Sequence, residues 1–316
     1  MINIALIGCG KWGKNYTNAL QNIEEVNLSW VYNKSNDPMI ELPADTGFTK
    51  DYHRILDDKR VDAVIISTPP GTHYRYSREA LEAGKDVLVE KPMTLNSADS
   101  REIADLADKG KRILMVGHLF LYNPAIIELK KFVKNGELGE VLYFNSQRTG
   151  KGPFRSDISV MWDQAVHDIS VLNFLKNDTP IKITARGISF LNNNIEDVVA
   201  LDMEYSDGSR GLVYASWYEP EKIRKTTIVG SKKTVIFDDC SKAKLRVFDN
   251  IDIEKPPLSL DPGCISPLEN QCIQFVKSIK AREKPISDGH LGHSIVQILE
   301  HAQKSLETGA SIEVRL

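Results

Sequence analysis

A glycine-rich segment directly after the first apolar run constrains this chain more than any other feature. Residues 2–7 read Ile-Asn-Ile-Ala-Leu-Ile, and Gly8-Cys9-Gly10-Lys11-Trp12-Gly13 follows at once, ahead of a helical pattern over 14–21. Such a turn lets the backbone approach a pyrophosphate, while the helix start supplies free N–H groups and the positive end of its dipole. The alternative is an ordinary tight turn. The position between strand and helix favours a dinucleotide site.

The first 117 residues continue this alternation of strand and helix. Five short runs are almost wholly apolar, as parallel strands buried on both faces are, and they cover residues 2–7, 28–32, 61–67, 86–90 and 113–117. Helical patterns cover residues 14–21, 73–83 and 97–108. The alternation predicts an α/β domain with a doubly wound parallel sheet.

The pattern changes after Gly117. Runs rich in β-branched and aromatic residues lie between 181 and 248, and helical patterns lie near 123–135, 163–176, 270–280 and 290–308. This order predicts a C-terminal α+β domain with a large mixed or antiparallel sheet. We expect a dinucleotide-binding domain at 1–117 and a substrate and oligomerisation domain at 118–316, with the last helix able to pack back on the first domain.

Composition excludes several classes of protein. The chain carries 40 basic and 43 acidic residues, so its net charge of −3 gives no general attraction to nucleic acid or an anionic membrane. Its four cysteines form no CxxC pair and do not cluster with histidines at metal-ligand spacing, so we expect no metal site. With no signal-peptide pattern and no apolar stretch of membrane-spanning length, we expect a cytoplasmic protein.

The end of the second predicted strand bears on the choice between NAD and NADP. A carboxylate there would hold the ribose hydroxyls of NAD, but this chain has Tyr32-Asn33-Lys34-Ser35 instead. Asn33 can bond a ribose hydroxyl without repelling a 2′-phosphate, and Lys34 could pair with that phosphate. The alternative is that Lys34 is a solvated surface charge. We expect NAD(P), with a slight preference for NADP.

Glu90-Lys91-Pro92 follows the fourth predicted strand, at the sheet edge where open α/β folds bind ligands. A lysine there can donate a hydrogen bond to a substrate, whereas an ion pair between Glu90 and Lys91 would be only structural.

Four motifs together resemble the glucose–fructose oxidoreductase/inositol dehydrogenase (Gfo/Idh/MocA) family. They are Gly8-x-Gly10-x-x-Gly13, Thr68-Pro69-Pro70-x-x-His73, Glu90-Lys91-Pro92 and Asp163-x-x-x-His167-Asp168. The resemblance implies a Rossmann domain and a catalytic set of Lys91, Asp163 and His167. It also implies that the cofactor is held by Gly8, Gly10, Lys11, Trp12, Gly13, Asn33, Lys34, Ser35, Thr68, Pro69, Pro70, His73, Glu90 and Lys91. A cis peptide bond between Lys91 and Pro92 is expected, as in many similar proteins.

The spacing of Asp163 and His167 agrees with this assignment. Residues four apart share one face of an α-helix, so the carboxylate can orient the imidazole, which can abstract a proton from a secondary alcohol. A lone histidine is more often structural, but the partner carboxylate and Glu90-Lys91-Pro92 favour the catalytic interpretation. The other histidines lack this pattern, and we treat them as structural by default; they are His53, His118, His290, His293 and His301.

Two further segments are Gly117-His118-Leu119-Phe120-Leu121-Tyr122-Asn123-Pro124 and Arg148-x₆-Arg155-Ser156-Asp157, with Trp162 after the second. They resemble a subgroup of that family acting on amino sugars, often nucleotide-linked. Aromatic rings can pack on sugar C–H faces, an amide can bond hydroxyls, and arginines can grip a diphosphate bidentately. We therefore expect substrate contacts from Lys91, Tyr122, Asn123, Arg148, Arg155, Trp162 and His167. The alternative is that the charges lie on a solvated loop and the aromatic rings lie in the core.

These observations predict an NAD(P)-dependent dehydrogenase that acts on a CH–OH group of a sugar, amino sugar, nucleotide sugar or inositol. Two alternatives remain: a non-catalytic nucleotide-binding sensor or subunit, and transient-oxidation glycoside chemistry on the same scaffold. We expect a homo-oligomer, dimer or tetramer, built through the second domain's sheet.

Overall fold

The computed structural model describes residues 1–34, 42–191, 195–263 and 265–314. The chain divides into two compact units, one formed by residues 1–119 and 266–296, the other by residues 120–265 and 297–316. Segment 266–296 thus lies in the first unit, whereas the predicted boundary placed it in the second. The reason is tertiary, because helix α7 (Pro267–Ala281) packs on α1 (Gly13–Gln21), where the Gln271 amide donates to the Tyr16 hydroxyl.

In the described part of the first unit, six parallel strands lie in the order β3-β2-β1-β4-β5-β6. They are β1 (Ile2–Ile7), β2 (Val26–Tyr32), β3 (Gly47–Thr49), β4 (Ala63–Ile66), β5 (Asp86–Val89) and β6 (Leu114–Val116). Every residue of β4, β5 and β6 is buried, which explains their continuous apolar sequences. This confirms the predicted doubly wound sheet.

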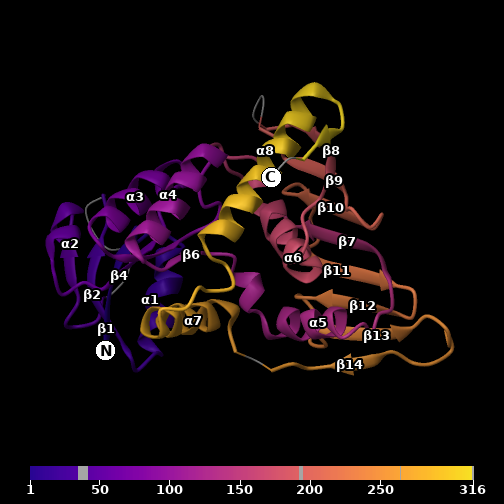
Figure 1. The fold of residues 1–316 in the computed structure, drawn as a ribbon, viewed down its shortest axis with the longest axis horizontal. Helices are drawn as coiled ribbons and strands as arrows, with labels where there is room; N and C mark the ends of the chain where they lie inside the picture. The colour runs from indigo at the N-terminus through magenta and orange to yellow at the C-terminus, as the bar shows by residue number, and fades with distance from the viewer. Residues whose placement is uncertain (35–41, 192–194, 264, 315–316) are drawn as a thin grey trace. The chain divides into compact units, whose positions relative to one another are not determined.

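Helices cover this sheet (Figure 1). Besides α1 and α7 they are α2 (His53–Asp57), the short 3₁₀ turn Pro70–Thr72, α3 (His73–Glu82) and α4 (Ser97–Gly110). Helix α1 packs on β1 and β2, while α3 packs on β4 and β5 and against α4. Helix α4 begins where Asn96 accepts a hydrogen bond from the Asp99 amide, an N-cap.

The second unit is built on a mixed sheet of nine strands among the described residues, in the order β14-β13-β12-β11-β7-β10-β9-β8-β15. The strands are β7 (Val141–Thr149), β8 (Lys182–Ile188), β9 (Val198–Glu204), β10 (Arg210–Ser216), β11 (Ile223–Gly230), β12 (Lys233–Asp238), β13 (Leu245–Asp249), β14 (Leu258–Leu260) and β15 (Ile312–Glu313). Strands β7 and β10 run parallel and the other neighbours antiparallel, which confirms the predicted α+β class.

One face of this sheet is covered by helices. Helix α5 (Pro124–Lys134) contacts β12, and α6 (Val166–Lys176) contacts β7 and β10 (Figure 1). Helix α8 (Gly289–Thr308) begins in the first unit and ends in the second. Burial alternates along β9 and β10, as expected when one face is covered and the other is not.

Candidate active site

Each of the three glycines in the first loop is explained by a different feature of the structure. Gly8 has a φ of +97°, and an added Cβ would lie 2.8 Å from the Ser67 carbonyl oxygen. A Cβ on Gly13 would lie 2.3 Å from the Gly8 carbonyl oxygen, so Gly13 allows helix and strand to pack closely. A Cβ on Gly10 would meet no described atom within 4 Å. Packing therefore does not require glycine at position 10, whereas close approach of a ligand would, and this fits the pyrophosphate of a dinucleotide.

Glu90 connects this loop to the residues after β5. Its Oε1 accepts hydrogen bonds from the Trp12 indole and the Tyr16 hydroxyl, both at 2.6 Å, and its Oε2 lies 3.1 Å from the Lys91 amide. Burial raises the pKa of the carboxyl, while the Tyr16 hydroxyl and the Lys91 charge act in the opposite direction. Gln271 completes the network from α7 by donating to Tyr16 at 3.0 Å. Sequence reasoning found Glu90 and Trp12 but missed Tyr16 and Gln271, because no local spacing links them.

The peptide bond between Lys91 and Pro92 is cis, which confirms that prediction. His73 stands between the two loops at this edge of the sheet, with its Nδ1 2.8 Å from the Pro92 carbonyl oxygen and its Nε2 2.8 Å from that of Thr68. Pro70 opens the 3₁₀ turn ahead of His73, and Thr72 Oγ1 bonds Thr68 Oγ1 at 2.7 Å. His73 therefore holds the Thr68 and Pro92 segments together.

Asn33 and Lys34, which we expect to bear on the choice between NAD and NADP, follow β2. The backbone N–H of Asn33 donates to the Thr49 carbonyl at 3.3 Å. The Asn33 side chain is half-buried, and that of Lys34 is exposed. Ser35, also predicted to touch the cofactor, lies outside the described residues.

In the second unit, Asp163 and His167 lie on one helix, but its start is not α-helical. Met161–Ala165 forms a π-helical turn, and α6 begins at Val166. The prediction that Asp163 and His167 lie on a regular α-helix is therefore wrong for the turn that holds Asp163. Asp163 lies 3.4 Å from Arg155 and accepts a hydrogen bond from Gln164 at 2.9 Å. π-Turns are frequent at functional sites.

His167 is 7% exposed, and its ring meets that of Phe120 edge-on at 5.2 Å between centroids. The Ser170 hydroxyl donates to the His167 carbonyl oxygen. The imidazole is thus buried in the second unit beside the Phe120 ring.

Arg148 forms a buried ion pair. Its Nε lies 2.7 Å from Asp168 Oδ2 and its Nη2 3.2 Å from Oδ1, and its guanidinium stacks over Phe120. Ser146 donates to the same carboxylate at 2.8 Å. Arg148 is 4% exposed, so most of its donors serve the fold, and its expected grip on a diphosphate stays a prediction.

The other predicted substrate residues also have structural contacts. Asn123 caps α5 by accepting from the Ala125 amide, and Trp162 donates to Gln303 at 3.4 Å. Tyr122 is 1% exposed. Arg155 is bonded to Asp157 and Asp163, yet keeps 30% of its side chain exposed. Of Arg148 and Arg155, Arg155 is therefore the more exposed to solvent.

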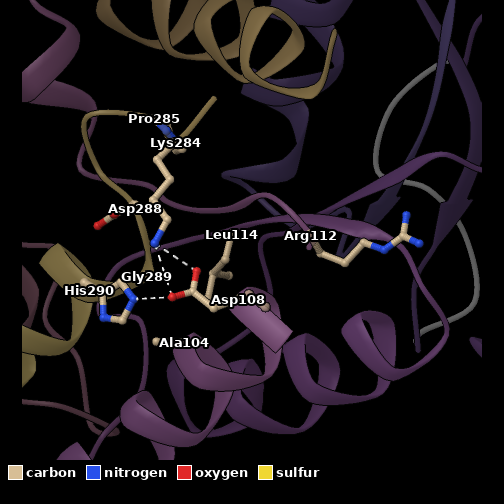
Figure 2. A pocket seen from close by; sticks show the side chains of 10 residues that line it. Ala104, Asp108, Arg112, Leu114, Lys284, Pro285, Asp288, Gly289 and His290 are labelled. Carbon is tan, nitrogen blue, oxygen red and sulfur yellow. Dashed lines mark hydrogen bonds and ion pairs between the residues drawn. The ribbon is translucent and has the colours of Figure 1, made fainter. Parts of the chain in front are cut away.

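Figure 2 shows a pocket in the first unit with a different character. Asp108 from α4 lies 2.9 Å from the Lys284 ammonium and 2.7 Å from His290 Nε2, and these two groups lower the pKa of its carboxyl, His290 more strongly. Leu114, the first residue of β6, also lines it. The pocket thus lies by the amino end of β6, whereas ligands of such sheets bind at carboxyl ends. Its charges connect α4 to the start of α8.

The described residues offer neither a membrane-spanning helix nor a metal-binding cluster. No helix there is long and apolar enough to cross a membrane. No group of three or more histidine, cysteine or acidic side chains there is arranged to hold a metal ion.

Two family models match the chain. Residues 2–118 match the model described as an oxidoreductase family with an NAD-binding Rossmann fold, and residues 126–236 match the GFO/IDH/MocA C-terminal domain. Myo-inositol 2-dehydrogenase of Thermotoga maritima is 24% identical over an alignment 334 residues long, gaps included. The alignment covers 99% of this chain and 98% of that protein.

Solved structures share the fold over nearly the full length. UDP-N-acetylglucosamine 3-dehydrogenase from Acidithiobacillus ferrooxidans superposes with a TM-score of 0.87 at 22% identity, covering 97% of this chain and 98% of that one. GenD2 from gentamicin A biosynthesis, solved in complex with NAD, gives a TM-score of 0.88 at 21% identity, covering 100% and 97%.

Proposed function

Because the chain belongs to the GFO/IDH/MocA family of NAD-binding oxidoreductases, we propose that it interconverts a secondary alcohol and a ketone on a sugar, amino sugar, nucleotide sugar or inositol. The observation that carries the proposal is the set of hydrogen bonds that the Glu90 carboxylate accepts. One buried carboxylate bonds both Trp12 of the glycine loop and the backbone amide of Lys91. A lysine is thus held beside the loop that leaves room for a pyrophosphate at Gly10.

We assign three residues to the reaction. In the direction of oxidation, His167 takes the hydroxyl proton, Lys91 donates a hydrogen bond to the same oxygen, and Asp163 orients the imidazole. The bound nicotinamide supplies the acceptor for the hydride. Lys91 belongs to the first unit and His167 to the second. Turnover by Lys91→Met and His167→Ala tests these two assignments.

We propose that NADP binds at least as tightly as NAD. Support comes from the side-chain amide of Asn33 and the exposed ammonium of Lys34. They stand where a carboxylate would disfavour the 2′-phosphate of NADP. Calorimetric titration of both dinucleotides tests it, with Lys34→Ala expected to weaken NADP selectively. At least tenfold tighter binding of NAD, about 1.4 kcal/mol, would contradict it.

For the substrate, we propose a sugar-type polyol, with a nucleotide-linked amino sugar as the specific candidate. Arg155 supports an anionic group on the substrate, because its guanidinium stays partly exposed beside Asp163. Named relatives act on inositols, which carry no such group. Arg155→Lys should then raise the KM for a nucleotide sugar while leaving that for a free polyol unchanged.

We further propose that the chain forms a homo-oligomer through the uncovered face of the nine-stranded sheet. A shallow groove on that sheet is lined by Asn145, Thr184, Arg186, Ala200, Leu201, Asp202, Leu212, Val213 and Tyr214. Leu212, in β10 beside the central strand β7, is 39% exposed. Light scattering should show a dimer or tetramer that Leu212→Arg dissociates. A monomeric wild-type chain would refute this proposal.

The test of the activity is a reduced-cofactor absorbance screen against sugars, inositols and nucleotide sugars. Turnover of one of them supports the dehydrogenase. A sensor would bind the dinucleotide without turnover. Transient-oxidation chemistry would cleave a glycoside without net cofactor reduction, which product analysis of the same reactions detects.

A further inference from the structure

His118 is buried at the edge of the sheet where ligands of such folds bind. It follows β6 after Gly117, whose amide donates to the Val89 carbonyl of β5 at 2.7 Å. A Cβ on Gly117 would come within 3.0 Å of the Glu90 carboxyl group, so this backbone lies directly against the segment that carries Lys91. The side chain is only 1% exposed.

Neither ring nitrogen of His118 has a hydrogen-bond partner among the described residues. Other buried histidines of the same unit do have partners. Both nitrogens of His73 lie 2.8 Å from carbonyl oxygens, and His293 Nδ1 lies 2.8 Å from the Ser100 hydroxyl. A buried polar group without a partner costs stability, so an unpartnered imidazole calls for a functional reason.

The ring is neutral at physiological pH. Burial, and after it the Lys91 charge, lowers the pKa of His118 to about 3. A base with that pKa does not abstract protons efficiently near pH 7. A neutral imidazole does offer one N–H donor and one lone pair, which together match a hydroxyl group.

We propose that His118 binds a hydroxyl group of the ligand that Lys91 also faces, either on the ribose of the nicotinamide nucleotide or on the polyol substrate. This rests on the proposed function, and it assigns a ligand-binding role to a histidine that the sequence pattern marks only as structural. Because both nitrogens are shielded from solvent, a covering side chain has to move as the hydroxyl enters. His118 then positions the ligand, while proton transfer stays with His167.

The experiment uses His118→Leu, which removes both polar atoms while keeping an apolar side chain. Since the free protein loses a buried unsatisfied group, the melting temperature should rise. Loss of one hydrogen bond to the ligand should weaken binding by about three- to tenfold. Titration with NAD alone tests whether the hydroxyl that His118 binds belongs to the ribose. The KM of the polyol found in the screen tests whether it belongs to the substrate. A structural histidine would not give higher stability together with weaker binding.

Two further variants sharpen the test. His118→Asn and His118→Gln keep a donor and an acceptor near the positions of Nδ1 and Nε2, so one of them should restore the lost affinity. His293→Leu is the matched control: it breaks the bond to Ser100, so it should lower the melting temperature and leave NAD affinity unchanged.

A lower melting temperature of His118→Leu overturns the proposal, because it means that the ring is satisfied within the fold. Unchanged NAD affinity together with unchanged KM overturns it as well. If no polyol is turned over, the proposed function fails, and the melting and NAD titrations alone decide the role of His118.

Discussion

The indole N–H of Trp12 donates a hydrogen bond to the Glu90 carboxylate across 2.6 Å, although 78 positions separate the two residues. Trp12 lies in the glycine loop, and Glu90 directly precedes Lys91. The geometry of the loop and the position of the lysine therefore depend on one buried carboxylate, which Tyr16 also bonds.

Trp12→Phe removes the donor to Glu90 and keeps an aromatic ring. Because the Glu90 carboxylate is 6% exposed and loses one of its donors, the free energy of unfolding of the variant should fall by about 1–3 kcal/mol. The NAD affinity should fall several-fold as the loop loses its link to Glu90. Trp30→Phe is the control, since it also breaks a tryptophan–carboxylate bond, to Asp58, but away from the glycine loop. Equal NAD affinities of Trp12→Phe and wild type would show that the link is not needed.

Alanine substitutions in the glycine loop should separate ligand binding from folding. At Gly10 a Cβ meets no atom of the part of the chain that the structure describes within 4 Å. Gly10→Ala should therefore fold normally yet weaken NAD binding by at least about tenfold, because the methyl group blocks the pyrophosphate. At Gly13 the Cβ would lie 2.3 Å from a backbone oxygen, so Gly13→Ala should cost about 1–3 kcal/mol of stability. Calorimetry and urea unfolding measure both. Full NAD affinity in Gly10→Ala would place the pyrophosphate elsewhere.

Removal of Arg148 should destabilise the second unit. Arg148→Met leaves Asp168, which is 2% exposed, as an unpaired buried charge, and such losses cost about 3–5 kcal/mol. Asp168→Asn added to Arg148→Met should recover part of this. Urea unfolding gives the stabilities. If Arg148→Met keeps wild-type stability but raises the KM, the arginine serves the substrate instead of the fold.

His118 should make stability depend on pH in mildly acidic buffer. Its pKa is lowered to about 3 in the folded chain, whereas an unfolded histidine has about 6.5. The unfolded state therefore takes up an extra proton as the pH falls below about 6.5, and stability is lost in that direction. Between pH 7.5 and 5.5 this single group contributes a loss of about 1.4 kcal/mol. Urea unfolding of His118→Leu should show a loss smaller by that amount. An identical pH dependence in both proteins would mean that folding leaves the pKa of His118 unchanged.

Much of the fold could be predicted from the sequence, because long buried strands leave strong local patterns. Strand β1 has the bounds that its apolar run indicates, and the glycine loop lies where the motif requires. The short elements β3 and α2 were missed, since three and five residues carry too little periodicity to be recognised.

The motifs of the candidate site can be recognised in the sequence, but the contacts that support them cannot. Glu90, Lys91 and His167 stand in recognisable motifs. The pairing of Arg148 with Asp168 and the bond from Gln271 to Tyr16 join residues 20 and 255 positions apart, and only the folded chain brings them together. The π-turn before α6 also escaped, because a five-residue change of helix type leaves no clear sequence signal.

The most direct test of the central claim is turnover by His167→Ala and Lys91→Met on the substrate found in the screen, with NAD titration and urea unfolding of the same proteins. His301→Ala, a histidine change in the second unit where the ring bonds the Gln297 carbonyl, is the control. Loss of the general base should cost about 10²–10⁴-fold in rate, with NAD affinity and stability of His167→Ala close to wild type. Lys91→Met should also lose turnover, since it cannot donate to the reacting oxygen. Near-normal turnover by His167→Ala would remove this residue from the mechanism, and lost turnover with an unfolded chain would make His167 structural.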